Sequence, residues 1–282
     1  MTSLTVKLWP SVAEFRQAVS PALRQTEAAN NLLLGLMENH SDAPFPIMAT
    51  VEDAMGLSLT ALQTDPFSNL ILSFSQRIDA AVYLADYLAE VGANLPGVLG
   101  PVTLAQPFAE RWSGRTGASW AISVQERIFS IQKVECESGN LGELRWASQS
   151  DRDWLCQWLA DFIREALPHD HTERIAENVA KRLEEFPRSG FLILEENARP
   201  RCLAGFAGPT GSGIRVGPVF TPPHLRNKGY ASYTVRALTF RLLQWGYASV
   251  FLFTDLANPT SNSIYQKMGY QPVIDVTQYR FR

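Results

Sequence analysis

The segment from Thr221 to Ser232, TPPHLRNKGYAS, places two cations and a glycine directly before a helix-like sequence. The first turn of a helix has unpaired backbone N–H groups and carries the positive end of the helix dipole. Arg226 and Lys228 add positive charge there, and Gly229 has no side chain to keep a ligand away from the backbone. The segment therefore suits a phosphate or pyrophosphate group, although taken alone it is somewhat more typical of a polar turn.

The segment does not match the two commonest nucleotide-binding loops. It contains neither the Gly-x-x-x-x-Gly-Lys pattern nor the Gly-x-Gly-x-x-Gly pattern. An anion site in this segment must therefore belong to another class of fold, and the neighbouring elements have to identify it.

Those neighbouring elements follow from the spacing of apolar residues. Residues 213–221 have the composition of a strand, and Tyr230–Trp245 has apolar side chains close to the 3.6-residue spacing of a helix. Residues 248–255 are largely apolar, which is typical of a strand buried on both faces. Asn258 and Pro259 are typical of the N-cap and the first residue of a second, short helix.

Two motifs on these elements resemble the signatures of the GNAT acetyltransferase superfamily. Arg226–Ala231, RNKGYA, is similar to its Arg/Gln-x-x-Gly-x-Gly/Ala motif. Asn258, Tyr265 and the KMGY of Lys267–Tyr270 are similar to its Asn-x-x-Ala-x-x-x-Tyr-x-Lys-x-Gly-Phe helix, with Ser261 at the Ala position. The second half of the chain looks like the bacterial predicted-acetyltransferase branch, which is related in layout to glycine N-acyltransferases.

This resemblance implies an acetyl-CoA-dependent N-acyltransferase, in which a small-molecule amine attacks the thioester directly in a ternary complex. It implies that the first strand splays from the second and pairs its free backbone groups with the pantetheine arm. Tyr265 would protonate the departing CoA thiolate, which a phenol can do; its alternative role is ordinary helix packing. The cofactor-binding residues implied in this way are Val219, Phe220, Thr221, Arg226, Asn227, Lys228, Gly229, Tyr230, Ala231, Ser232, Asn258 and Asn262.

The reaction also needs a group that takes a proton from the amine. Asp255, at the end of the strand 248–255, is our candidate for this base, and its alternative role is to fix the following turn. His169 and His171 lie between two predicted helices, where they could deprotonate the amine or be solvated loop residues. With Asp170 they lack the further ligands that a metal site requires, so no metal is expected.

The first half of the chain repeats the order of predicted elements. We therefore expect an α/β fold of two tandem GNAT-like domains, each a mixed twisted sheet flanked by helices, with a linker within Lys133–Arg145. The N-terminal domain, residues 1–138, is expected to be degenerate, because residues 95–112 enter a helix without the Arg/Gln-x-x-Gly-x-Ala motif. The C-terminal domain, residues 139–282, is expected to be catalytic. The first domain could cover the acceptor pocket, mediate a homodimer or serve as a scaffold.

Composition narrows the function classes further. A net charge of −3 over 282 residues argues against a nucleic-acid-binding protein. No apolar run approaches about 18 residues, and the first residues lack a signal-peptide core, so we expect no membrane segment and a cytoplasmic location. The three cysteines are isolated, which agrees with a reducing compartment.

A second function class stays open at this stage. A non-catalytic acyl-CoA-binding or sensing module would keep the cationic segment but would not need Tyr265 as a proton donor. A structural protein with a vestigial motif is a third alternative. The identity of the acceptor and the length of the acyl chain do not follow from the sequence.

Overall fold

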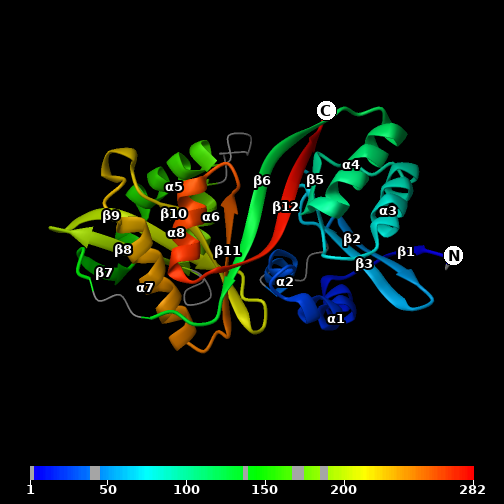
Figure 1. Cartoon of the computed structure of the whole chain (residues 1–282). Helices are drawn as coiled ribbons and strands as arrows, with labels where there is room; N and C mark the ends of the chain where they lie inside the picture. The colour runs from blue at the N-terminus through cyan, green and yellow to red at the C-terminus, as the bar shows by residue number, and fades with distance from the viewer. Residues whose placement is uncertain (1–2, 39–44, 136–138, 167–174, 185–189) are drawn as a thin grey trace. The chain divides into compact units, whose positions relative to one another are not determined.

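A computed structural model of the chain describes residues 3–38, 45–135, 139–166, 175–184 and 190–282. The contacts within the chain divide it into two compact units. Figure 1 draws the whole chain as a ribbon. Unit 1 comprises Met1–Ile128, Thr254–Ala257 and Val273–Arg282, and unit 2 comprises Phe129–Phe253 and Asn258–Pro272. The last residues of the chain thus belong to unit 1. The domain boundaries expected from the sequence, 1–138 and 139–282, stay a prediction.

Unit 1 contains a mixed sheet with helices. Strands β1 to β4 pair antiparallel in chain order, β5 is parallel to β4, and β12 pairs antiparallel with β5. Its elements are β1 Thr5–Leu8, α1 Val12–Leu23, η1 Arg24–Thr26, α2 Asn31–Glu38, β2 Ile47–Asp53, β3 Gly56–Gln63, β4 Leu70–Leu72, α3 Ile78–Glu90, β5 Gly97–Pro101 and α4 Val102–Thr116, with most of β6 Trp120–Ile131 and β12 Gln271–Phe281.

Unit 2 has the same type of sheet. Strands β7 to β10 pair antiparallel in chain order, and β11 is parallel to β10. Its elements are β7 Glu143–Trp146, η2 Gln149–Asp151, α5 Arg152–Ala166, α6 Ile175–Glu184, β8 Gly190–Glu196, β9 Arg199–Ala207, β10 Gly213–Phe220, η4 Pro223–Leu225, α7 Tyr230–Gln244 and α8 Pro259–Met268, with most of β11 Ser249–Asp255. The predicted helices at Tyr230 and Pro259 and the predicted mixed α/β fold are confirmed.

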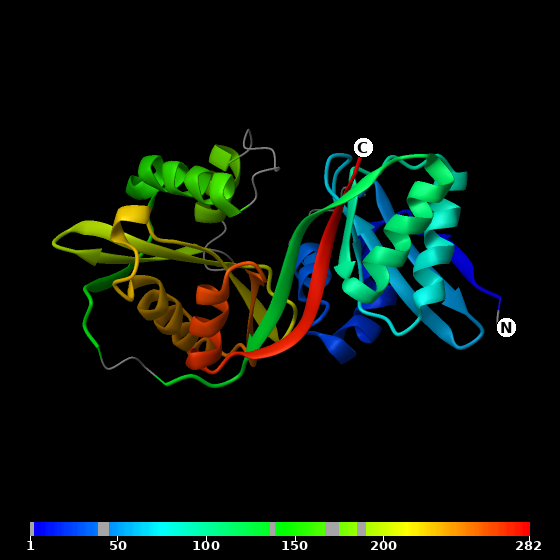
Figure 2. The same ribbon diagram turned by 45° about the horizontal axis from the view of Figure 1, so that its top comes forward.

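In unit 2 the alternation of side chains along the strands separates two cores. Phe191 and Leu203 pack with residues of α5 and α6, whereas their neighbours Leu192 and Ala204 pack with residues of α7 and α8. Figure 2 shows α5 and α6 on one face of this sheet and α7 and α8 on the other. In unit 1 the same alternation places α3 and α4 on one face and α1 and α2 on the other. Each sheet therefore has a layer of helices on each of its two faces.

The loop that corresponds to the cationic segment can be found in unit 1 from the strand pairing. In each unit the fourth antiparallel strand leads into a helix, so the loop before α3, residues 73–77, corresponds to the loop before α7. It is not the segment 95–112 that was expected from the sequence, which forms β5 and the start of α4. Arg77 in this loop is ion-paired with Asp53 and with Asp79 in the first turn of α3. The unit's own carboxylates thus occupy the cationic helix start.

Helix α5 is anchored to the sheet of unit 2 by a partly buried ion-pair network. Arg145 on β7 donates two hydrogen bonds of 2.7 Å to Asp151 and a third of 2.7 Å to Glu195 on β8. Asp151 also accepts a hydrogen bond from the backbone N–H of Ser148 at 2.8 Å. These bonds, chiefly those from Arg145, lower the pKa of Asp151 to about 2 although burial opposes the shift.

Replacing Asp151 with Asn is expected to lower the free energy of unfolding by about 2 kcal/mol at pH 7. Because the folded-state pKa lies below the ordinary value of 3.8, this stabilisation is present above about pH 4 and is lost as the pH falls toward 2. Denaturant unfolding at pH 7 and at pH 3 measures it. A difference between wild type and variant that does not shrink at the lower pH would contradict the assignment.

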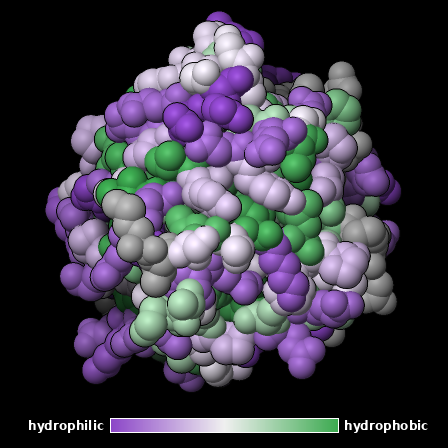
Figure 3. All heavy atoms as spheres, turned by 90° about the vertical axis from the view of Figure 1, so that its right-hand side faces the viewer, coloured by the Kyte–Doolittle hydropathy of each residue, from purple (hydrophilic) through white to green (hydrophobic). Residues whose placement is uncertain are grey.

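The exposed surface has mixed polarity. On the face drawn in Figure 3, hydrophilic and hydrophobic residues are interspersed. Among the described residues, no helix is both long and apolar enough to cross a membrane. In the predicted linker Lys133–Arg145, residues 136–138 lie outside the described residues, and β7 begins at Glu143.

Candidate active site

The predicted anion site is formed by the chain between β10 and α7. After β10 the chain passes through η4 and enters α7 at Tyr230. Asn227 and Gly229 both have a left-handed backbone, with φ of 63° and 81°. Glycine adopts this conformation without strain and asparagine at a smaller cost than most residues, so both residue types suit this helix entry. The first turn of α7 contains no acidic residue, so no carboxylate on this turn competes for the positive end of its dipole.

The two cations of this segment have different environments. Arg226 donates from Nε to the backbone oxygen of Thr221 at 2.9 Å and from Nη2 to Oε2 of Glu165 on α5 at 2.6 Å. Lys228 is exposed and has no ion pair within the described part of the chain. Arg226 thus links the segment to α5, whereas Lys228 is available to an anionic ligand.

Beside this helix start, β10 separates from β11. The parallel ladder between the two strands ends at Val216 and Leu252. Strand β10 nevertheless continues to Phe220 and stays paired with β9 through Val219 and Phe220 after a register shift. The last residues of β10 therefore have one edge outside the β10–β11 ladder, which is the divergence that the sequence resemblance implied.

The phenol of Tyr265 on α8 is held in its protonated form. Burial raises its pKa to about 12, and the neighbouring Cys202 thiol adds to the shift. Burial also raises the pKa of Cys202 to about 11, against the opposing effect of the Thr221 and Thr234 hydroxyls. Tyr265 therefore keeps its proton at neutral pH, as a proton donor must, and Cys202 is not an activated nucleophile.

Tyr230, Ala231 and Ser232 form the first turn of α7. The Tyr230 side chain is 7% exposed, and its hydroxyl donates a hydrogen bond of 3.2 Å to Oε2 of Glu196. Ala231 and Ser232 are partly buried. Since the Tyr230 side chain is engaged with the protein, its expected contribution to ligand binding is the backbone N–H alone.

The turn between β11 and α8 is stabilised by its own polar side chains. Asp255 accepts a hydrogen bond of 2.8 Å from the N–H of Ala257. Asn258 caps α8 by accepting a bond of 3.0 Å from the N–H of Ser261, and Asn262 donates a bond of 2.8 Å to the backbone oxygen of Asn258. The turn-fixing role that was the alternative for Asp255 is thus present, and its role as the base stays a prediction.

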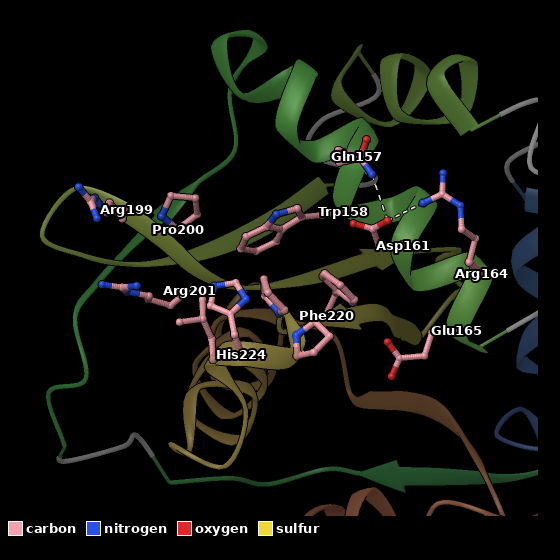
Figure 4. Close-up of a pocket in the computed structure, with 13 residues that line it drawn as sticks. Gln157, Trp158, Asp161, Arg164, Glu165, Arg199, Pro200, Arg201, Phe220 and His224 are labelled. Carbon is pink, nitrogen blue, oxygen red and sulfur yellow. Dashed lines mark hydrogen bonds and ion pairs between the residues drawn. The ribbon is translucent and has the colours of Figure 1, made fainter.

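An open pocket of about 840 Å³ adjoins the same strand end. It lies between α5, the start of β9 and the turn that follows β10, as Figure 4 shows. Its lining includes Trp158, Asp161, Glu165, Arg199, Arg201 and Phe220. Phe220 also belongs to the strand end implied for the cofactor, so the pocket and the predicted cofactor site share a wall.

Parts of this site were not foreseen from the sequence. Glu165 and Trp158 come from α5, and Glu165 is 61 residues from its partner Arg226, so only folding brings them together. The Arg199-Pro200-Arg201 pattern was a usable signal, since alternate residues of a strand point to one face. His169, Asp170 and His171 lie outside the described residues. In the described ranges, no group of three or more His, Cys, Asp or Glu could hold a metal ion.

In this α/β protein an open strand edge lies beside the positively polarised start of a helix. The helix start suits a phosphate group of a ligand, and the strand edge suits an extended arm of the same ligand. Residues 154–270 match the model of the acetyltransferase (GNAT) family. This matched segment contains both sequence motifs and is similar to a GNAT acetyltransferase domain, as the motifs predicted. No curated protein matches the sequence.

Solved structures share the fold over nearly the whole chain. A GNAT-family acetyltransferase from Colwellia psychrerythraea has a TM-score of 0.60 at 8% identity, covering 99% of this chain and 100% of that one. A GCN5-related N-acetyltransferase from Kribbella flavida has a TM-score of 0.59 at 13% identity, covering 92% and 95%. A Drosophila protein has a TM-score of 0.65 at 12% identity, covering 98% of each chain. At these identities the likeness is one of fold.

Proposed function

We propose that unit 2 transfers an acetyl group from acetyl-CoA to a small-molecule amine. The observation that carries the proposal is the end of the β10–β11 ladder at Val216, in the strand that leads through η4 to the helix start with Lys228 and Gly229. The free edge of β10 suits the amide groups of a pantetheine arm, and the helix start suits a pyrophosphate. The match of residues 154–270 to the GNAT family supports the same assignment.

In this proposal the donor is held mainly by backbone groups. Val219, Phe220 and Thr221 offer their free edge, and the N–H groups from Asn227 to Ser232 face the phosphates, with Lys228 adding charge. Asn258 and Asn262 lie beside the pantetheine. Bound acetyl-CoA supplies the acyl thioester, and the chain aligns it, accepts the proton of the amine and stabilises the leaving sulfur.

The proposed chemistry is direct acyl transfer. The amine nitrogen forms a bond to the thioester carbonyl carbon, the carbon–sulfur bond breaks, and the sulfur leaves with the electron pair. Tyr265 donates its proton to the sulfur, while the proton lost by the nitrogen restores the phenol through solvent or through Asp255 as base. Burial raises the pKa of Tyr265 to about 12, so the phenol carries its proton at physiological pH, which the proposed donor role requires.

For unit 1 we propose a GNAT-like domain without a cofactor site. Its strand pairing and helix order repeat those of unit 2. The ion pairs of Arg77 with Asp53 and Asp79 support the absence of donor binding, because they bring carboxylates to the helix start that would repel a phosphate. A covering role over the acceptor or a role in a homodimer stays open for this unit.

Two measurements test the function. Isothermal titration with acetyl-CoA should give a saturable heat, and a thiol-release assay across a panel of amines should give free CoA only with particular acceptors. Acetyl-CoA that produces neither heat nor amine-dependent thiol release would show that the proposal is wrong.

Replacing Glu165 with Gln is expected to tighten acetyl-CoA binding about two- to fivefold at low salt. The variant removes the carboxylate that pairs with Arg226 at 2.6 Å and so frees the guanidinium for the pyrophosphate. The pair is exposed, so the gain should disappear near 1 M salt, where the Debye length is about 3 Å. Titrations at the two salt concentrations measure this; equal or weaker binding by the variant at low salt would contradict it.

A further inference from the structure

The pocket between α5 and β9 has charged residues at two ends. Figure 4 shows Arg199 and Arg201 at one end, Asp161 and Glu165 at the other, and the Trp158 ring between them. A ligand in this pocket therefore meets a basic end, an aromatic middle and an acidic end. The net charge of each end depends on which of its side chains are already paired within the protein.

At the acidic end both carboxylates are already paired. Asp161 accepts a hydrogen bond of 2.5 Å from Arg164 and one of 3.0 Å from Gln157. Glu165 pairs with Arg226 at 2.6 Å. This end thus offers little net charge to a ligand, because each carboxylate has a guanidinium within hydrogen-bond distance.

The opposite end has an excess of positive charge. Arg199 and Arg201 are alternate residues of β9 and therefore lie on one side of the strand. Arg199 is exposed and, among the described residues, has no ion pair. The Arg201 side chain is 20% exposed; its Nη2 pairs with Glu196 at 3.1 Å, while its buried Nε has no hydrogen-bond partner. Two guanidinium groups thus share one carboxylate, which leaves one positive charge unmatched.

The floor between the two ends is aromatic. The rings of Trp158 and Phe220 are 5.7 Å apart in an edge-to-face arrangement. Because Phe220 is also part of the strand end proposed to hold the donor, a ligand on this floor lies beside the donor. The floor suits an apolar body, and the unmatched guanidinium suits a planar anion that accepts two hydrogen bonds.

We propose that the acceptor is an amine that carries a carboxylate, as an amino acid does, and that Arg199 and Arg201 bind this carboxylate. The inference rests on the proposed acetyl transfer and adds the substrate class. The carboxylate at the β9 end and the apolar body on Trp158 direct the amine toward the donor at Phe220.

The test compares L-phenylalanine with L-phenylalaninamide, and further amino acids with their carboxamides, as acceptors in the thiol-release assay. We expect kcat/KM to be at least tenfold higher for the carboxylates. Arg199→Gln should lower kcat/KM for the carboxylates about tenfold, through KM, and leave the carboxamides unchanged. Arg152→Gln, which removes an exposed cation of α5 outside the pocket lining, is the control and should leave the carboxylate preference intact.

Three outcomes would overturn this inference. Equal kcat/KM of the wild type for carboxylates and carboxamides would show that the acceptor is not recognised by a carboxylate. The proposed acetyl transfer would not be affected by this result. An Arg199→Gln variant that loses affinity for acetyl-CoA but not for its 3′-dephospho form would assign the anion site to the donor's phosphate. Absence of both acetyl-CoA binding and thiol release with any amine would instead overturn the proposed function itself. Thermal melts of Arg199→Gln check that the exposed substitution leaves the fold intact.

Discussion

Replacement of Tyr265 with Phe is expected to lower kcat about 100-fold, at the lower end of what a positioned general acid contributes. The variant removes only the hydroxyl, so the aromatic packing against Tyr270, with ring centroids 5.9 Å apart, is retained. Because the hydroxyl acts on the leaving sulfur, affinity for acetyl-CoA should change less than about twofold. Steady-state kinetics together with isothermal titration separate the two quantities.

The control for this variant is Tyr270→Phe. The Tyr270 hydroxyl is 2.7 Å from Oγ1 of Thr239 in the core, so its loss is expected to lower stability by about 1 kcal/mol without changing kcat. If Tyr265→Phe binds acetyl-CoA and turns over as fast as the wild type, Tyr265 is not the donor. If neither the wild type nor the variant turns over while both bind acetyl-CoA, the acyl-CoA-binding module is the correct function class.

The pH dependence of kcat provides a second readout for Tyr265. Its pKa of about 12 lies above the ordinary value of 10.0, so the donor form persists through neutral and moderately alkaline pH and is lost only as the pH approaches 12. We therefore expect no alkaline decline of kcat below about pH 10 from this group. An alkaline limb near pH 9 that disappears in Tyr265→Phe would contradict the raised pKa.

Replacement of Gly229 with Val is expected to weaken acetyl-CoA binding at least tenfold, or about 1.4 kcal/mol. Gly229 has a φ of 81°, and a β-branched residue is strongly disfavoured there. The added side chain also extends from the backbone that is proposed to face the pyrophosphate, where it would keep the phosphates from the N–H groups. Titration of folded variant with acetyl-CoA measures the loss.

Gly246→Val is a matched control for this prediction. Gly246 follows the other end of α7, has a φ of 98°, and a Cβ there would meet no atom within 4 Å. Both variants should lose about 1–3 kcal/mol of stability from backbone strain. Only the change at Gly229 should weaken acetyl-CoA binding. Equal affinities for the two variants would mean that Gly229 serves the helix entry alone and that the donor does not approach it.

The sequence prediction matched the wrong segment of the first half with the cationic segment, and the composition of the two helix starts explains this error. The loop before α3 has no glycine and contains Arg77, so by composition it does not resemble the segment before α7. The segment 95–112 enters a helix at the place that matches in the order of predicted elements, and the prediction compared it on that ground. Strand pairing, with β5 parallel to β4 and β11 parallel to β10, assigns the correspondence correctly, and pairing is not visible in composition.

The sequence by itself determined the local features that depend on neighbouring residues. These are the helix start after Gly229, the Asn258 cap of α8, the order of strands and helices, and the similarity to the GNAT family, whose two motifs are each contiguous in the chain. Such features are set by backbone conformation and by hydrogen bonds over a few residues, so their signals are local.

Only the tertiary structure decided which side chains of the segment TPPHLRNKGYAS are already paired within the protein. Arg226, expected to act on the ligand, is paired with Glu165, while Lys228 is left available. The end of the β10–β11 ladder at Val216 and the raised pKa of Tyr265 depend on strand pairing and on burial. These quantities arise from contacts between residues far apart in the chain, because desolvation and charge pairing depend on distance in space and not on separation in sequence.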